Sequence, residues 1–125
     1  MSRATIVIAA YNAQDTVGRV IAELCAKGFG DVVVVDDGSA DGTGDAAAKA
    51  GATVLTHPIN RGQGAALRTG IAYALAQGAE VIVTFDADGQ HRAADLPRLI
   101  EPVARGDVDV ALGSRFLTRK TRMPL

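Results

Sequence analysis

Residues 32–39 read Val32-Val33-Val34-Val35-Asp36-Asp37-Gly38-Ser39, four valines followed at once by two aspartates and a turn. Four consecutive β-branched residues leave no polar face, so this run predicts a strand buried on both sides, as in a parallel sheet. The abrupt change to Asp, Gly and Ser predicts that polar groups lie where the strand ends. The same arrangement recurs along the chain and decides the fold class.

Further aliphatic runs lie at residues 6–10, 81–85 and 108–112, with a weaker one at 53–56. Between them, apolar residues recur with helical spacing over 17–24, 44–50, 67–75 and 96–103. Gly28, Gly51 and Gly78 follow the first three of these segments, where a helix commonly ends. Strands therefore alternate with helices, which predicts an α/β fold: an open, mostly parallel sheet with helices on both faces.

Length and composition restrict the function classes. The chain has 125 residues, enough for one domain, and 48% of them are hydrophobic, which argues against disorder. A net charge of −1 gives no basic field, so no nucleic-acid partner is expected. The lone Cys25 excludes a disulfide framework and favours a cytoplasmic setting, and we expect Cys25 and His57 to be structural. No apolar run approaches the roughly 20 residues that span a bilayer.

Polar residues follow every predicted strand. Ligands of open α/β sheets bind beyond the carboxyl ends of the strands, so these residues are the candidate site. They are Tyr11-Asn12, Asp36-Asp37-Gly38-Ser39, Asn60-Arg61-Gly62-Gln63-Gly64, Asp86-Ala87-Asp88-Gly89-Gln90-His91 and Gly113-Ser114-Arg115.

The segment Asp86-x-Asp88 is the sharpest of these features. Two carboxylates two residues apart at a strand end can face the same side, and such oxygen ligands suit Mg²⁺ or Mn²⁺ bound to substrate phosphates. Gln90 adds a neutral oxygen. The alternative is a turn whose Asp side chains bind local backbone N–H groups. The spacing does not fit a calcium-binding EF-hand loop.

Three other segments allow both a structural and a ligand-binding interpretation. Asp37 can accept from a ribose hydroxyl or a base N–H, while Ser39, Asp41 or Thr43 can cap a helix. The glycines of residues 60–64 begin a predicted helix that either binds an anion or forms a plain loop. Arg115 can clamp a diphosphate or lie solvated at the surface.

Together, in this order and spacing, the five segments resemble the N-terminal part of the family-2 inverting glycosyltransferases with the GT-A fold. Among these, the dolichyl-phosphate and polyprenyl-phosphate sugar synthases are most similar. The resemblance covers residues 6–117. It implies a Rossmann-like half that binds a nucleotide sugar at 1–117. Residues 118–125, which contain Arg119, Lys120 and Arg122, form a basic tail after it.

The resemblance also implies chemistry: sugar transfer, with inversion, from a nucleotide-diphosphate sugar to an acceptor such as a polyprenyl phosphate, with Mg²⁺ or Mn²⁺ as cofactor. It implies a cytoplasmic enzyme, peripheral at the inner membrane surface. Asp86 and Asp88 would be catalytic, and Asp88 and Gln90 would hold the metal. The substrate would be bound by Ala9, Tyr11, Val35, Asp37, Asp86, Ala87 and Arg115.

The sequence departs from the family pattern in two ways. Positions 9 and 13, often Pro and Glu in the family, are both alanine, which leaves the identity of the nucleotide open. Family members also continue well past residue 115, so we expect a truncated chain. Two alternatives therefore stay open: a fragment that binds metal and nucleotide without transferring sugar, and a receiver-like signalling domain. Self-association is a further option.

Overall fold

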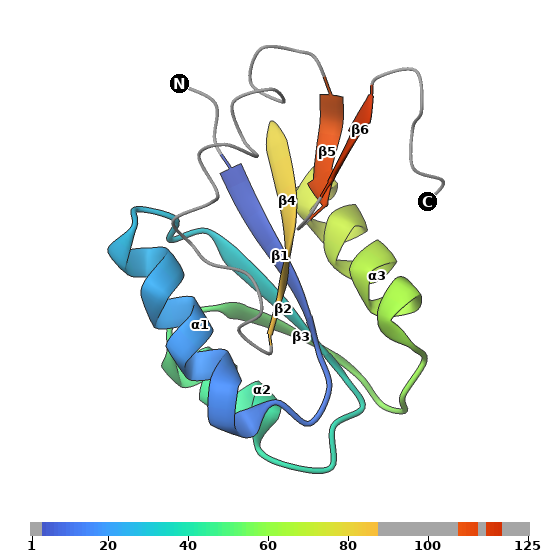
Figure 1. The fold of residues 1–125 in the computed structure, drawn as a ribbon. Helices are drawn as coiled ribbons and strands as arrows, with labels where there is room; N and C mark the ends of the chain where they lie inside the picture. The colour runs from blue at the N-terminus through green and yellow to red at the C-terminus, as the bar shows by residue number, and fades with distance from the viewer. Residues whose placement is uncertain (1–3, 88–107, 113–114, 119–125) are drawn as a thin grey trace.

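The structure, a computed structural model, describes residues 4–87, 108–112 and 115–118. Within these ranges a sheet of six strands carries helices on both faces (Figure 1), which confirms the predicted fold class. The elements, in chain order, are β1 (Ala4–Ala10), α1 (Gln14–Ala26), β2 (Val32–Asp37), α2 (Thr43–Lys49), β3 (Thr53–His57), α3 (Gln63–Ala76), β4 (Val81–Asp86), β5 (Val108–Leu112) and β6 (Arg115–Thr118).

The strand order is β3-β2-β1-β4-β5-β6, and all neighbouring pairs are parallel except β5 with β6. The chain therefore builds outward from β1 to β3 and then returns to the other side of β1 for β4. This reversal between β1 and β4 is where open α/β sheets bind ligands. The order also differs from the 2-1-3-4-5 order of flavodoxin-like folds, which a receiver domain would require.

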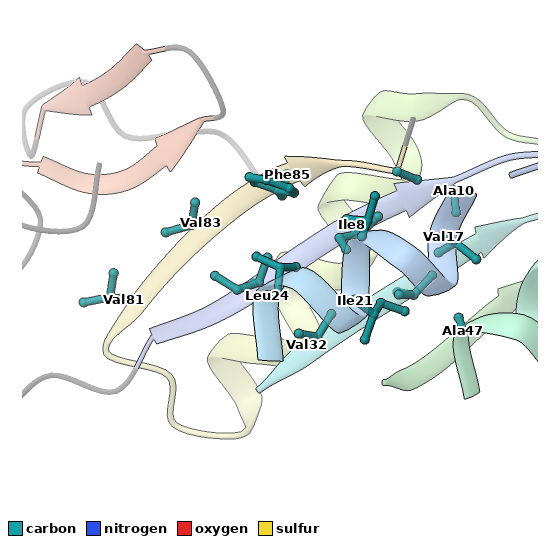
Figure 2. Close-up of a cluster of buried hydrophobic side chains, with 14 residues drawn as sticks. Ile8, Ala10, Val17, Ile21, Leu24, Val32, Ala47, Val81, Val83 and Phe85 are labelled. Atoms are coloured by element: carbon teal, nitrogen blue, oxygen red, sulfur yellow. The ribbon is translucent and has the colours of Figure 1, made fainter. Parts of the chain in front are cut away.

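One face of the sheet packs against α1 and α2 (Figure 1). The predicted stripe of α1 is confirmed, since all four of its apolar residues are buried against the sheet: Val17, Val20, Ile21 and Leu24. Figure 2 shows three of them, Val17, Ile21 and Leu24, in one cluster with Ile8, Val32, Val83 and Phe85 from three neighbouring strands. Because each strand alternates its side chains between the two faces, the valines between these positions serve the opposite face.

The opposite face packs against α3, which approaches the sheet closely at Gly70. A Cβ atom on Gly70 would lie 2.4 Å from Cγ1 of Val7, so only glycine fits at this crossing. The buried residues of α3 are Ala66, Gly70, Ile71 and Ala74. Leu75 was expected in the buried stripe, but it is 48% exposed. The side of α3 that faces the sheet is centred on Gly70 and Ala74, and this turns Leu75 outward.

The ends of the first three helices agree with the sequence prediction, whereas the last strand does not. Gly28, Gly51 and Gly78 have positive φ just after the first three helices, as expected of glycines that end a helix. Strand β6 was not predicted, and it ends at Thr118, the first residue of the expected tail. The helix predicted over 96–103 lies outside the described residues. Among the described helices, none has the length and apolarity needed to cross a bilayer.

The crossing at Gly70 predicts opposite effects for two Gly→Ala substitutions. Gly70→Ala should lower the free energy of unfolding by about 1–3 kcal/mol, because the added methyl group overpacks the contact with Val7. Gly18→Ala, within α1, meets nothing closer than 4.0 Å and should raise stability by up to about 1 kcal/mol through helix propensity. Urea unfolding of both variants measures the effects, and a stabilised Gly70→Ala protein would contradict the packing.

Candidate functional site

A cavity of about 260 Å³ opens at the carboxyl ends of β1 and β2. Its walls come from the end of β1, the end of β2 and the segment that leads into α3. The lining residues are Ala9, Ala10, Tyr11, Asp37, Asn60 and Gln63. Tyr11 is 54% exposed and offers its side chain at this end of the sheet. The cavity thus lies beside the reversal in strand order, where the fold is expected to bind a ligand.

Asp37 is the most highly connected side chain of the cavity. Its Oδ1 atom accepts from the backbone N–H of Arg61 at 3.0 Å and lies 2.7 Å from Nδ1 of His57. Its Oδ2 atom accepts from the backbone N–H of Gly62 at 2.8 Å. Asn60 adds a side-chain bond to the Asp37 carbonyl oxygen. The anion next to the start of α3 is therefore the protein's own carboxylate.

Asp36 serves the other face of the sheet. Its Oδ1 atom accepts from the backbone N–H of Ser39, and its Oδ2 atom lies beside Gly44 of α2. The alternation along β2 explains why two adjacent aspartates have different surroundings. Gly38, which follows them, has φ of +72° and leaves no room for a Cβ, since that atom would lie 2.4 Å from the backbone nitrogen of Asn60. Glycine here lets the 59–60 segment close over Asp37.

Electrostatics keep the Asp37 carboxyl ionised. Burial alone raises the pKa of Asp37, but the bonds from His57 and from the backbone N–H groups of Arg61 and Gly62 outweigh it, so its pKa lies below the ordinary value. An ionised carboxylate only accepts hydrogen bonds, so Nδ1 of His57 must carry a proton. The pair at 2.7 Å is a buried charge-assisted hydrogen bond.

The loop after β1 and the loop after β2 are joined by reciprocal hydrogen bonds. The backbone N–H of Asn12 donates to Ser39, and the side-chain oxygen of Asn12 accepts from the N–H of Ala40. The N–H of Gln14 donates to Asp41, whose pKa is lowered mainly by its bond from the Thr43 hydroxyl. Asp41 is not itself an N-cap residue, since the N-cap of α2 is Gly42, but it accepts from the first N–H group of both α1 and α2.

The end of β4 lies next to the cavity. In the sheet register Asp86 pairs with Ala9, and Ala10 pairs with Asp36, so the two acidic segments flank the same strand at the same edge. Ala87 is buried in the core beneath α1, and its carbonyl oxygen accepts from the Thr16 hydroxyl at 2.8 Å. Asp88 and Gln90 lie outside the described residues. Within the described part of the chain, no three acidic, His or Cys side chains form a metal-binding group.

The structure thus gathers some predicted residues and separates others. Ala9, Tyr11 and Asp37 share the cavity. Val35 is fully buried and lies toward Gly70 of α3, while Ala87 is 7% exposed, and neither is among the residues that line the cavity. Arg115 begins β6 opposite Leu112, which places its backbone at the carboxyl end of β5.

Sequence reasoning undervalued two residues of the site. His57, expected to be only structural, pairs with Asp37 in the β2–β3 register, so it also belongs to the polar strand ends. Gln63, the first residue of α3, lines the cavity. The signal for His57 was its position at the end of a short strand, the same criterion that singled out Asp37. Cys25 is exposed on α1.

The lowered pKa of Asp37 predicts an acid-sensitive contribution to stability. A carboxyl whose folded pKa lies below its ordinary 3.8 stabilises the fold above about pH 4 and loses that contribution as the pH falls through the folded value. Asp37→Asn should lower the free energy of unfolding by about 3 kcal/mol at neutral pH. The difference in free energy of unfolding between the variant and the parent protein should become smaller below about pH 4. Urea unfolding of both proteins at several pH values measures this difference, and a difference that does not change with pH would contradict the assignment.

Comparison with known proteins identifies the family. The family model described as glycosyl transferase family 2 matches residues 5–123. An uncharacterized protein of Methanocaldococcus jannaschii is 42% identical over 122 residues, 96% of this chain and 50% of that protein. The UDP-N-acetylglucosamine–dolichyl-phosphate N-acetylglucosaminyltransferase of Methanococcus voltae is 31% identical over 139 residues, 96% of this chain and 55% of the enzyme.

A solved structure supports the same assignment. Glucosyl-3-phosphoglycerate synthase of Mycobacterium tuberculosis, in complex with Mn²⁺, UDP-glucose and phosphoglyceric acid, matches with a TM-score of 0.70 and 26% identity. The match covers 85% of this chain and 40% of that structure. The chain thus spans about half the length of the curated relatives it matches. Its sheet and its sequence place it in one family: the chain belongs to glycosyl transferase family 2, with the GT-A fold.

Proposed function

We propose that this chain is the donor-binding part of a glycosyltransferase that moves a sugar, with inversion, from a nucleotide-diphosphate sugar to a polyprenyl phosphate. The observation that carries the proposal is the cavity at the ends of β1 and β2, lined by Asp37 and Tyr11 and adjacent to the strand that ends in Asp86. The family assignment supports the reaction class.

The cavity would bind the nucleoside. Carboxylate oxygens offer about four acceptor positions, and the described contacts of Asp37 use two on Oδ1 and one on Oδ2. The remaining position favours a donor group, either a base N–H or a ribose hydroxyl. At about 260 Å³ the cavity is smaller than a typical ligand pocket of about 300–1,000 Å³. It therefore suits the nucleoside, while the diphosphate and sugar extend toward β4.

Asp86, Asp88 and Gln90 would hold Mg²⁺ or Mn²⁺. Their oxygens fit the preference of these cations for carboxylate and carbonyl ligands, and the similar synthase was solved with Mn²⁺ and UDP-glucose. When bound, such a cation neutralises the charge that develops on the departing diphosphate. The chain's own contribution is to anchor the turn, since Ala87 is held by the core and by the Thr16 hydroxyl.

The acceptor would be a lipid phosphate, as the name of the Methanococcus voltae relative indicates for that enzyme. An acceptor phosphate oxygen forms the new bond to the anomeric carbon, and the bond to the donor diphosphate breaks with its electron pair on the leaving group. Because the acceptor is already anionic, no general base is required. Arg115, at the carboxyl end of β5, would contact phosphate. A lipid acceptor would place the reaction at a membrane surface, and we propose that the enzyme is peripheral there, on the cytoplasmic side.

Substitution of Asp88 tests the proposal. Asp88→Ala should abolish the Mn²⁺-dependent part of nucleoside-diphosphate affinity, measured by calorimetry with UDP and GDP, because it removes a metal ligand. Glu80→Ala is the control: Glu80 is an exposed acid just before β4, at the opposite edge of the sheet. Mn²⁺-dependent affinity that survives in Asp88→Ala would sink the metal assignment.

Sugar transfer needs its own measurement. Incubation of the chain with radiolabelled UDP-glucose or UDP-N-acetylglucosamine, Mn²⁺ and polyprenyl phosphate should yield labelled lipid if the chain is catalytically complete. Nucleotide binding without labelled lipid would instead support the alternative of a binding fragment. Absence of any nucleotide binding would overturn both.

A further inference from the structure

We infer that His57 and Thr69 are positioning residues for the nucleoside: they hold the Asp37 carboxylate in the orientation that leaves one acceptor position on Oδ2 for the ligand. The inference rests on the proposed function, because it assigns a task to residues behind the cavity wall. Neither residue is among those that line the cavity, so both would act through Asp37.

The contacts form a continuous chain from α3 to the cavity. Nε2 of His57 lies 2.9 Å from the Thr69 hydroxyl oxygen, and Nδ1 lies 2.7 Å from Oδ1 of Asp37. His57 is 7% exposed, so its ring has little contact with water. Both ring nitrogens have a protein partner instead. A ring turned by half a rotation would lose both bonds at once, which fixes the side of the ring that faces Asp37.

Thr69 can satisfy either protonation state of the ring. Its hydroxyl oxygen lies 3.0 Å from the Ala65 carbonyl oxygen, one helical turn earlier. When the ring is doubly protonated, the hydroxyl donates to Ala65 and accepts from Nε2–H. When only Nδ1 is protonated, the hydroxyl donates to Nε2 instead. In both states Nδ1–H continues to donate to Asp37, so the carboxylate keeps its orientation.

The backbone donors alone do not supply this restraint. The N–H groups of Arg61 and Gly62 belong to the loop that precedes α3, and they approach Asp37 from that loop only. His57 approaches from β3, where the register places it directly beside Asp37. Removing the His57 bond leaves each carboxylate oxygen with one backbone donor, both from the same loop, so the orientation of Asp37 then follows the movements of that loop alone.

The test compares Thr69→Val, which removes the hydroxyl at nearly constant shape, with Thr69→Ser, which keeps it. Calorimetry with Mn²⁺ measures the affinity for UDP and for pyrophosphate, which lacks the nucleoside. Thr69→Val should weaken UDP binding about tenfold, and Thr69→Ser should restore it to within about threefold of the parent protein. Pyrophosphate affinity should not change in either variant.

Two further variants separate positioning from general damage. Thr5→Val removes a comparable hydroxyl, bonded to Asp31 at the opposite edge of the sheet, and should leave UDP affinity unchanged. His57→Asn keeps a short donor toward Asp37 but loses Thr69, so it should resemble Thr69→Val. Equal UDP affinity in Thr69→Val and the parent protein overturns the inference, as does equal loss of UDP and pyrophosphate binding.

Nuclear magnetic resonance tests the hydrogen bond from Nδ1 of His57 to Asp37 without any nucleotide. The chain has two histidines, so His57→Asn assigns the ring signals. The parent protein should show a protonated Nδ1 with a downfield proton that disappears in Asp37→Asn and broadens in Thr69→Val. A neutral ring protonated only on Nε2 overturns the inference. If the parent protein binds neither UDP nor GDP, the proposed function fails, and this measurement alone decides how Asp37 is oriented.

Discussion

The site depends on one nearly buried carboxylate. Asp37 is 2% exposed, and an ionised group with so little contact with water is tolerated only if protein donors replace the lost solvent. Two segments provide three donors: β3 through His57, and the loop before α3 through two backbone N–H groups. The same bonds that satisfy the charge therefore hold β2, β3 and the start of α3 together, and they shape one wall of the cavity.

Much of the fold could be predicted because each strand is a continuous aliphatic run that ends in polar residues. Parallel strands buried on both faces need such runs, and βαβ connections allow few arrangements. Strand β6 could not be predicted in this way: residues 115–118 contain Arg and Thr beside Phe and Leu, and an edge strand needs no continuous apolar run. The exposed position of Leu75 depends on the approach at Gly70, which periodicity alone does not reveal.

The candidate site was predictable in its location and less so in its contacts. The rule that ligands bind beyond the carboxyl ends pointed to Asp37 and Tyr11, and the family resemblance added Ala9. The hydrogen-bond partner of a carboxylate at a strand end depends on the register between neighbouring strands, and this register cannot be read from the sequence. Asp37 meets His57 because β2 and β3 align those two positions. The predicted task of the glycine-rich segment changed for the same reason, since two of its N–H groups are occupied by Asp37.

The reciprocal bonds between the loop after β1 and the loop after β2 have a consequence for how this scaffold can be altered. Each loop supplies side chains that satisfy the backbone of the other, through Asn12 on one side and Ser39 and Asp41 on the other. If only one of the two loops were replaced by that of a relative, backbone N–H groups of the other loop would lose their hydrogen-bond acceptors. The two loops are therefore a single exchangeable module, to be transplanted as a pair by anyone who wishes to alter the ligand preference of this protein.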